Sequence, residues 1–242
     1  MEAIHDLLAY DGLKIIQDKN KVSFSIDALL LADFIKPKKE TNAIIDLGCG
    51  NAPIPLYLSL KTKAKIVGVE LQTEIANLAK RSISLNNLTE QIEIINQDCN
   101  DLRKEVKYKH YFDIVLSNPP YFANQSHLNK NDYLSLARHE LSLRLQDLIA
   151  TSKYLLKNHG SFYLIHQTKR LEEIIKLLNL EKFKVIKIRF IHAKPFKESR
   201  LFLLEAKRVS NKDLVIEKPL FVYDENNHYT EEIINIFNFK NV

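Results

Sequence analysis

The sequence has few residues that could form disulfide bonds or bind a structural metal. Its 242 residues include only two cysteines, Cys49 and Cys99, and neither lies in a CxxC or Cys/His pattern. This excludes a disulfide scaffold and a zinc finger. The eight histidines lack the short spacings of a metal site, so no metal is proposed. Such cysteine usage fits a reducing, cytoplasmic setting.

The sequence also lacks long hydrophobic runs and the basic, apolar start of a signal peptide. Its longest uncharged apolar runs are far shorter than the roughly 18 residues of a membrane helix. Hydrophobic residues make up 45% of the chain and charged residues 27%, which excludes a disordered chain and predicts a globular one. At about 150 residues per domain, we expect one compact domain with extensions.

Charge of one sign is not strongly in excess. Lysine and arginine number 35 against 30 aspartates and glutamates, a net charge of +5. This balance only tilts the odds toward a polyanionic partner, because many basic proteins bind no nucleic acid.

What the sequence does contain is an alternation of apolar strands and helices. Strands are predicted at residues 43–47, 65–70, 92–95, 112–117, 161–165, 184–191 and 200–205, and helices at 54–60, 73–86, 141–156 and 170–180. This order predicts an α/β fold with a mostly parallel, seven-stranded sheet and helices on both faces. Only residues 192–199 separate the last two strands, so the last strand is predicted to be antiparallel.

Two shorter elements precede this alternation. Residues 13–22 alternate apolar and polar side chains and predict a short hairpin or edge strand. Ser25 is a capping residue before an apolar helix over residues 28–35, which Lys36 and Pro37 end.

A glycine turn follows the first strand of the alternation, in Asp46-Leu47-Gly48-Cys49-Gly50. Glycines there let the backbone approach a ligand closely. A dinucleotide fingerprint needs glycine where Pro53 stands, so a dehydrogenase is disfavoured. Asp46 would repel a pyrophosphate, which favours a cationic or zwitterionic ligand. A Gly-x-Gly turn alone is equally compatible with a purely structural role.

Two more acids stand where strands end. Glu70 ends the second strand and is placed to accept hydrogen bonds from ribose hydroxyls. Asp98 follows the third strand and is placed to accept from an adenine amino group. The alternatives are a helix cap for Glu70 and a turn-forming role for Asp98.

Asn118-Pro119-Pro120-Tyr121, after the fourth strand, is the most specific motif in the chain. The consecutive prolines hold the backbone extended and leave the Pro119 carbonyl outside any helical ladder. With the Asn118 side chain, this carbonyl offers two acceptors to a planar amine, and Tyr121 offers a stacking face. An ordinary strand-terminating turn is the weaker interpretation.

Together these residues resemble the Rossmann-like class I methyltransferases that use S-adenosylmethionine to modify planar amino groups. Within them, the chain resembles the bacterial valine-tRNA adenine-37 N6-methyltransferases through segments that span nearly the whole sequence: residues 13–17, 24–32, 137–140 and 219–224. The resemblance implies S-adenosylmethionine as cofactor, the anticodon loop of valine tRNA as substrate, and no obligate protein partner or membrane.

The resemblance also implies residue roles. Asn118, Pro119, Pro120 and Tyr121 would orient and stack the target base. The expected cofactor-binding residues are Asp27, Asp46, Gly48, Gly50, Glu70, Leu71, Asp98, Cys99 and Asn118. Where many family members have a third glycine this chain has Ala52, which is small enough that we expect cofactor binding to survive.

RNA contacts are expected from basic residues late in the chain, Arg138, Lys194, Lys197 and Arg200, although for any one of them a solvated surface role is the commoner case. Residues 122–132 are polar and predict a flexible lid. We divide the chain into an N-terminal extension that packs on the cofactor site (1–40), a methyltransferase domain (41–208) and a C-terminal appendage (209–242). The appendage would either grip RNA or cover the sheet edge.

Three other functions remain open at this point. The same four-residue motif occurs in enzymes that methylate a release-factor glutamine at N5, and a ribosomal-RNA amine methyltransferase is the next alternative. From a different class, the chain would be a nucleotide- or RNA-binding module without chemistry. The intact motif at residues 118–121 argues against that last alternative.

Overall fold

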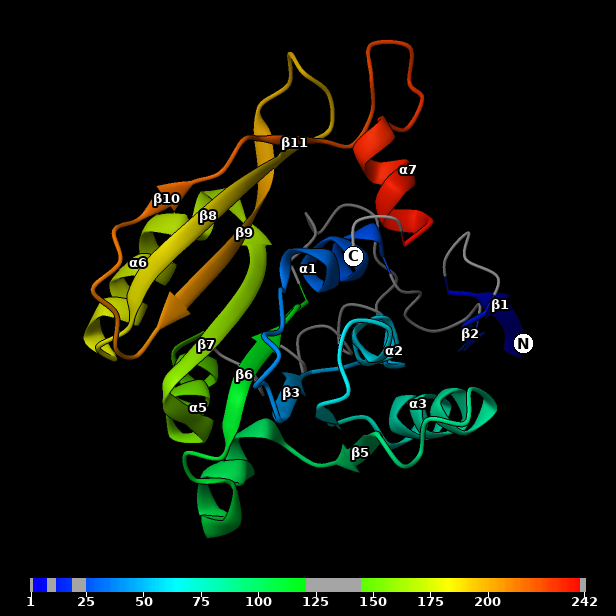
Figure 1. Ribbon diagram of the computed structural model, residues 1–242, viewed down its shortest axis with the longest axis vertical. Coiled ribbons are helices and arrows are strands. Elements are labelled where there is room, and N and C mark those ends of the chain that lie inside the picture. Colours follow the sequence, from blue (N-terminus) through cyan, green and yellow to red (C-terminus); the bar gives the residue numbers. More distant parts are fainter. Residues whose placement is uncertain (1, 8–11, 19–24, 121–144, 240–242) are drawn as a thin grey trace, which may run out of the picture.

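The computed structural model describes residues 2–7, 12–18, 25–120 and 145–239 (Figure 1). Its strands are β1 (Glu2–Asp6), β2 (Lys14–Asp18), β3 (Ala43–Leu47), β4 (Lys65–Glu70), β5 (Ile92–Asn96), β6 (Phe112–Ser117), β7 (Leu156–Gln167), β8 (Lys184–His192), β9 (Ser199–Lys207), β10 (Val215–Ile216) and β11 (Leu220–Phe221). Its helices are α1 (Ile26–Phe34), α2 (Pro53–Ser59), α3 (Thr73–Leu85), α5 (Leu145–Leu155), α6 (Leu171–Leu180) and α7 (Glu231–Phe237), with 3₁₀ turns η1 (Cys99–Lys104), η2 (Val106–Tyr108) and η3 (Thr168–Arg170).

The central sheet confirms the predicted α/β class. Its strands run in the order β10-β8-β9-β7-β6-β3-β4-β5. The strands from β3 to β8 are parallel, and β9 lies between β7 and β8 antiparallel to both. The short connection between β8 and β9 therefore forms a hairpin, as its length predicts.

Two differences from the predicted elements have clear physical reasons. β7 begins at Leu156, five residues before the predicted strand, because Leu156 already pairs with Phe112 ahead of a bulge in the ladder. The sheet also gains β10 and β11, two strands of two residues each that pair with β8. Strands this short leave no periodic pattern in a sequence.

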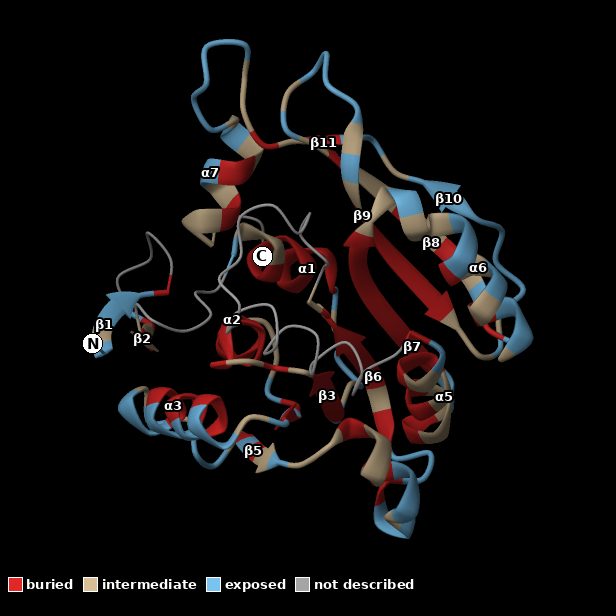
Figure 2. Ribbon diagram, turned by 180° about the vertical axis from the view of Figure 1, so that it is seen from behind, coloured by how far each residue is buried: buried red, intermediate tan, exposed pale blue. Residues whose placement is uncertain are grey.

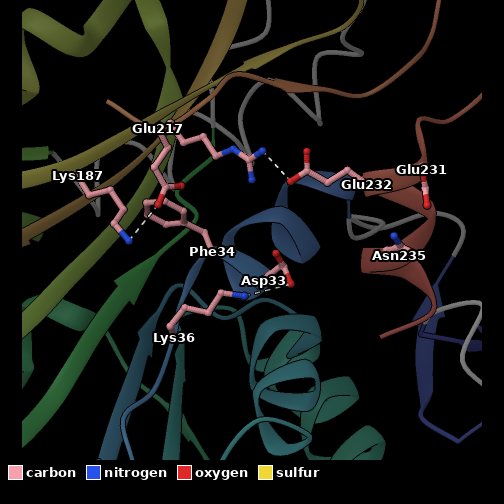
Figure 3. A pocket seen from close by; sticks show the side chains of 9 residues that line it. Asp33, Phe34, Lys36, Lys187, Glu217, Glu231, Glu232 and Asn235 are labelled. Carbon is pink, nitrogen blue, oxygen red and sulfur yellow. Dashed lines mark hydrogen bonds and ion pairs between the residues drawn. The ribbon is translucent and has the colours of Figure 1, made fainter. Parts of the chain in front are cut away.

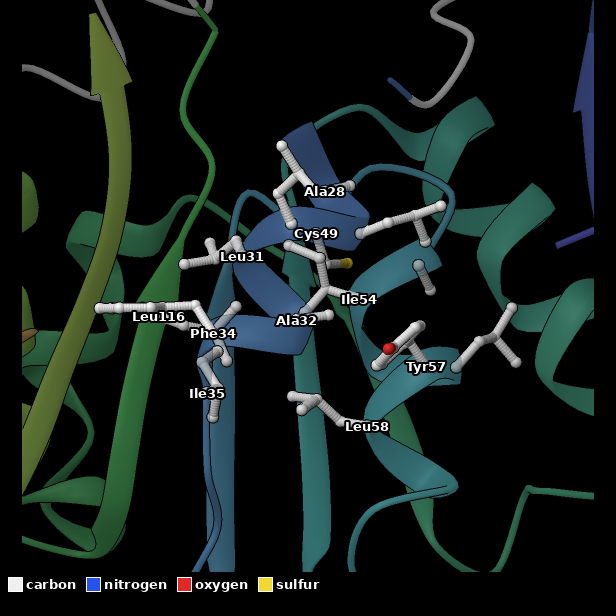
Figure 4. Packing of buried hydrophobic residues seen from close by; sticks show 14 of the residues in the cluster. Ala28, Leu31, Ala32, Phe34, Ile35, Cys49, Ile54, Tyr57, Leu58 and Leu116 are labelled. Carbon is white, nitrogen blue, oxygen red and sulfur yellow. The ribbon is translucent and has the colours of Figure 1, made fainter. Parts of the chain in front are cut away.

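Helices cover both faces of the sheet because neighbouring strand residues point to opposite sides. Ile44 faces the core under α1, α2, α3 and α7, while Ile45 faces the core under η1, α5 and α6. Figure 4 shows the first of these cores at α1, where Leu31 and Phe34 lie toward Leu116 of β6. The burial colours of Figure 2 place the buried residues of the helices against the sheet.

The N-terminal hairpin is attached to the outer face of α3. β1 and β2 pair antiparallel, so the predicted edge strand lies at residues 14–18 and its partner precedes it in the chain. The Asn86 side chain hydrogen-bonds both the backbone N–H and the carbonyl of Lys14, as a neighbouring strand would. Ser82 Oγ accepts from the backbone N–H of Ile16 at 3.0 Å.

The C-terminal segment covers the exposed edge of β8 with β10 and β11 and then packs α7 near α1. A cavity of about 400 Å³ lies along this junction. Three ion pairs lie among its lining side chains, Lys187–Glu217, Arg189–Glu232 and Asp33–Lys36 (Figure 3). None of the residues predicted for the functional site lines this cavity. Among the described residues, no helix is long and apolar enough to cross a membrane.

Candidate functional site

The predicted site residues at the ends of β3, β4 and β6 and just after β5 lie together at the carboxyl edge of the sheet, where the order of the strands reverses. β3 pairs with β4 on one side and with β6 on the other. The chain leaves β3 toward β4 and returns to β6 only later, so the two connections run in opposite directions from β3. Such a switch point is where open α/β sheets bind ligands.

The glycine turn after β3 is held by the neighbouring strand. Both Gly48 and Cys49 donate backbone hydrogen bonds to the carbonyl of Val69, at 2.9 and 3.0 Å. Gly48 (φ +79°) and Gly50 (φ +58°) both adopt the left-handed conformation that glycine favours. A Cβ atom on either would meet nothing within 4 Å, so open space lies beside the turn.

Ala52 completes the turn in the same left-handed conformation, with φ +71°. This backbone geometry is the physical reason why glycine suits the position. Ala52 is fully buried in the apolar cluster that includes Ile54 of α2, and this burial offsets part of the strain. Pro53 then begins α2, in the first-turn position that its fixed φ favours.

Glu70 joins β4 to the glycine turn. Its carboxylate accepts hydrogen bonds from the backbone N–H of Gly50 at 3.0 Å and of Gln72 at 2.8 Å. The residue is 2% exposed. The structure does not show the helix-cap alternative, because α3 has Gln72 at its N-cap and no side-chain cap. Glu70 instead organises two backbone turns at the end of β4.

Asp46 is the most unusual group in the site. It is 1% exposed, and neither of its carboxylate oxygens has a hydrogen-bond partner among the described residues. Burial, followed by repulsion from Glu70, holds the pKa of Asp46 well above its usual range. A buried carboxylate of this kind is costly unless a donor or a cation meets it. The site is thus suited to a ligand group that is positively charged or that donates a hydrogen bond.

The end of β5 and the residues after it lie next to Glu70. Asn96, at the end of β5, donates to the backbone carbonyls of Glu70 and Leu71, at 2.8 and 2.9 Å. Asp98 accepts from the backbone N–H of Asn100 at 2.8 Å and so caps η1, the turn-forming alternative. Cys99 is buried against the glycine turn through the backbone of Gly48. The structure thus brings Asp46, Gly48, Gly50, Glu70, Leu71, Asp98 and Cys99 to one edge.

Both cysteines of the site are chemically quiet. Burial is the main cause that raises the pKa of the Cys49 and Cys99 thiols. Protonated, buried thiols are poor nucleophiles, so neither cysteine is suited to covalent catalysis. Cys49 instead packs on Gly68, where an added Cβ would lie 2.8 Å from its sulfur.

Asn118, Pro119 and Pro120 follow directly from β6, one strand from the glycine turn. Ser117 fixes this junction, because its buried hydroxyl donates to the backbone carbonyl of Leu47 at 2.7 Å. Pro119 is buried, while Asn118 and Pro120 are partly exposed. Tyr121 lies outside the described residues, as do residues 122–132 of the predicted lid.

The first turn of α1 lies next to the glycine turn after β3. Figure 4 shows Ala28 of α1 above Cys49, and both belong to one buried cluster. Asp27 precedes Ala28, and burial is the main cause that raises the pKa of its carboxyl group. Sequence reasoning missed Asn51, a residue that is only 5% exposed. Its side-chain amide donates to the backbone carbonyl of Ile16 at 3.1 Å. This bond links the N-terminal hairpin to the glycine turn.

The expected RNA-binding residues are not part of this cluster. Lys194, Lys197 and Arg200 lie on the β8–β9 hairpin, at the carboxyl edge but beyond β7. Lys197 and Arg200 are exposed and Lys194 is partly so. Arg138 lies outside the described residues. Lys169, which was not among the predicted residues, is an exposed residue of η3 at the end of β7.

The family model for the methyltransferase small domain matches residues 24–188. The chain belongs to this family. Its resemblance to methyltransferases is therefore confirmed, and the matched residues include the glycine turn, Glu70, Asp98 and the motif after β6.

Several relatives of this methyltransferase have the same name, tRNA1(Val) (adenine(37)-N6)-methyltransferase. The protein of Shewanella halifaxensis is 28% identical over 85% of this chain and 87% of its own. That of Phocaeicola vulgatus is 26% identical over 90% and 92%, and that of Flavobacterium psychrophilum 23% over 94% and 96%.

Solved structures share the fold. A predicted O-methyltransferase from Agrobacterium tumefaciens superposes with a TM-score of 0.70 at 24% identity, covering 88% of this chain and 95% of the other. The TYW2 protein of M. jannaschii, solved in complex with AdoMet, gives 0.56 at 17% identity over 86% and 87%.

Proposed function

We propose that this methyltransferase transfers a methyl group from S-adenosylmethionine to N6 of adenine 37 in the anticodon loop of valine tRNA, in the cytoplasm. The observation that supports this most is the placement of Asn118, Pro119 and Pro120 one strand away from the turn of Gly48 and Gly50. A site for a planar amine thereby adjoins a site for the methyl donor. The shared name of the relatives, which match most of this chain, supports the choice of tRNA.

The end of β3 and the glycine turn after it fit the cofactor. The buried carboxylate of Asp46 has no partner among the described residues, and S-adenosylmethionine brings both an ammonium and a sulfonium charge. The open space beside Gly48 and Gly50 leaves room for its methionine end. Glu70 would hold the ribose, and Asp98 with Leu71 and Cys99 the adenine. Asp27 would close the site from α1.

The residues after β6 fit the acceptor. When bound, S-adenosylmethionine supplies a methyl group activated on a sulfonium sulfur. The Asn118 side chain and the Pro119 carbonyl would accept from the two N–H bonds of the adenine amine and so aim its nitrogen at that carbon. Tyr121 would stack on the base. As the N–C bond forms and the C–S bond breaks, the amine loses its proton to solvent, so the chain contributes positioning more than acid–base chemistry.

Adenine 37 must leave the stack of its loop before it reaches this site. Unstacking costs a few kcal/mol, and least in a single-stranded loop. Contacts of Lys194, Lys197 and Arg200, with Arg138, to the phosphate backbone would supply the compensating affinity. No metal and no obligate protein partner are part of the proposal.

A panel of acceptors tests the proposal. The protein and S-adenosylmethionine are incubated with unmodified valine tRNA, with the same transcript carrying guanine at position 37, with ribosomal RNA, and with a release factor. We expect methyl transfer to the first transcript alone. Transfer to the guanine-37 transcript would contradict the choice of base. If the release factor is methylated, and ribonuclease treatment does not reduce this methylation, the proposed reaction would be replaced by glutamine N5 methylation.

A further inference from the structure

The carboxyl edge of the sheet continues past the proposed acceptor site to a projecting loop. β7 lies beside β6, with Ser117 opposite Leu164, and β9 lies beside β7, with Leu201 opposite Gln167. The β8–β9 loop therefore rises from the same edge as Asn118, about 10 Å across the sheet at two strand spacings and at least about 10 Å further in the strand direction, because β7 runs three residues past Leu164 to Gln167. Several nucleotides of single strand cover such a distance.

This loop is built rather than loose. The Lys197 backbone N–H donates to the Lys194 carbonyl at 3.1 Å, which closes a tight turn with Pro195 and Phe196 at its tip. His192 Nδ1 is hydrogen-bonded to the Lys197 carbonyl at 2.7 Å. Below the turn, Ser199 Oγ lies 2.9 Å from the Ile191 carbonyl and 2.8 Å from that of Leu201.

The C-terminal segment braces the loop from outside. The backbone N–H of Tyr223 donates to the Ala193 carbonyl at 2.9 Å, and Lys194 Nζ lies 3.4 Å from the Glu225 carbonyl. Tyr223 in turn stacks on Tyr229, with ring centroids 5.0 Å apart. Figure 1 shows the β8–β9 loop and the loop between β11 and α7 projecting together from the sheet, and Figure 2 shows both as exposed.

At the tip of this braced turn, Phe196 is 85% exposed. A phenylalanine ring held in water by an ordered turn gains nothing for the fold. Its neighbours in the loop include Lys194 and Lys197, and Glu198 is the only acid between residues 192 and 200. An isolated ring between cations is unlike the contiguous apolar patch that a protein partner needs. It matches the pairing of aromatic stacking with positive charge that binds unpaired bases.

Between this loop and the acceptor site lies η3, with one exposed cation. Thr168 Oγ1 lies 3.3 Å from Ser199 Oγ, which joins η3 to the base of the hairpin. Lys169 is exposed there, whereas Arg170 forms two hydrogen bonds with Glu173, at 2.8 and 2.7 Å. Because η3 follows β7, Lys169 lies between Phe196 and the end of β6 along the sheet edge.

We propose that Phe196 stacks on an unpaired base of the RNA substrate, while Lys169 contacts a phosphate between that base and the methylated one. In the RNA sequence, the stacked base is adjacent to the methylated base or a few nucleotides from it. This proposal rests on the proposed function for the identity of the substrate as RNA. Since the turn is already ordered, stacking on Phe196 costs little conformational entropy. The braced tip thus fixes where the strand crosses the edge.

The test measures RNA binding separately from chemistry. Dissociation constants for an unmodified valine-tRNA transcript are measured by fluorescence anisotropy for the wild type, Phe196→Ala, Phe196→Trp and Lys169→Ala. Val106→Ala and Lys109→Ala are the matched controls, since both residues are exposed and stand just before β6, at the opposite edge of the sheet. Affinity for S-adenosylmethionine and methyl transfer are measured on the same proteins.

Phe196→Ala should weaken RNA binding roughly five- to 150-fold, and Phe196→Trp should retain it. Lys169→Ala should lower the slope of log Kd against log salt concentration by about one. Affinity for S-adenosylmethionine should not change. If Phe196→Ala binds RNA as well as Val106→Ala does, the proposal is overturned even where methyl transfer to tRNA is found. If RNA binding depends on Phe196 but no RNA is methylated, the surface stands and the proposed function fails.

Discussion

The Glu70 carboxylate and the Gly50 backbone N–H lie 3.0 Å apart, which ties the end of β4 to the turn after β3. The second oxygen of the same carboxylate holds the backbone of Gln72 at 2.8 Å. One buried side chain thus holds two backbone turns at the place where we propose that the ribose binds.

Glu70→Ala should therefore impair both stability and cofactor binding. Two hydrogen bonds to a charged acceptor are lost, so the free energy of unfolding should fall by about 3 kcal/mol. Glu70→Gln keeps one acceptor oxygen and should lie between. Urea unfolding and calorimetric titration with S-adenosylmethionine measure the two effects. Glu93→Gln, on the exposed face of β5, is the control; equal cofactor affinity in Glu70→Ala and the control would contradict the assignment.

Asp46 makes the opposite prediction for the ligand-free protein. Its folded-state pKa is raised above the ordinary value of 3.8, so its contribution to stability is complete below pH 3.8 and is lost as the pH rises through the folded pKa. Asp46→Asn should remove this loss and so should not destabilise the ligand-free protein near pH 7. It should weaken binding of S-adenosylmethionine at least tenfold, because a cation loses its partner.

The same carboxylate predicts proton release on binding. A cationic ligand favours the ionised form of Asp46, so its pKa should fall when S-adenosylmethionine binds. Titrations in two buffers of different ionisation enthalpy measure the released protons, and Asp46→Asn should release fewer. Identical proton release in the variant would show that Asp46 does not meet the ligand.

His166 predicts a loss of stability in acid. It is 3% exposed, and burial, with help from the charge of Arg170, lowers its pKa to about 4. Because the folded pKa lies below the ordinary 6.5, the contribution to stability is present above pH 6.5 and is lost as the pH falls toward 4. Its Nδ1 accepts from the Gln167 backbone N–H at 2.8 Å.

His166→Asn keeps an acceptor for that N–H but does not titrate. Denaturant unfolding at pH 7.5 and 5.0 should therefore show a smaller stability difference for the variant than for the wild type, by about 1–2 kcal/mol. Equal differences in the two proteins would show that His166 ionises in the folded state as it does in the unfolded chain.

Alanine substitutions at Gly48 and Gly160 separate a loss of stability from a loss of cofactor binding. A Cβ on Gly160 would lie 2.6 Å from Leu156 and 3.0 Å from the Asp113 carbonyl, whereas one on Gly48 would meet nothing within 4 Å. Gly160→Ala should lower the free energy of unfolding by about 1–3 kcal/mol and leave cofactor affinity unchanged. Gly48→Ala should cost about 1–2 kcal/mol through its left-handed backbone and also abolish cofactor binding. Retained binding in Gly48→Ala would show that the open space is not the cofactor site.

The parallel strands and the helices between them could be predicted because each leaves its own apolar period in the sequence. The antiparallel β9 followed from the shortness of residues 192–199. β10 and β11 could not be predicted, since pairing of two residues with β8 depends on where the preceding chain delivers them.

The site was predictable in its acids and glycines but not in their contacts. The charge of Asp46 already indicated a cationic or zwitterionic ligand. That Glu70 binds Gly50 depends on the left-handed conformation of the turn, which the residue types permit but do not require. Lys169 and Asn51 were missed because their neighbours, the β8–β9 hairpin and Ile16, are brought to them only by the fold.

Nucleoside mass spectrometry of unmodified valine tRNA, incubated with S-adenosylmethionine and either the wild type or Asn118→Ala, tests the central claim most directly. We expect N6-methyladenosine at position 37 with the wild type. Asn118→Ala should give a rate reduced at least hundredfold with cofactor affinity retained, since one of two acceptors for the amine is lost. Equal product from both proteins would contradict the role of the motif, and binding of S-adenosylmethionine by neither would contradict the account of the site.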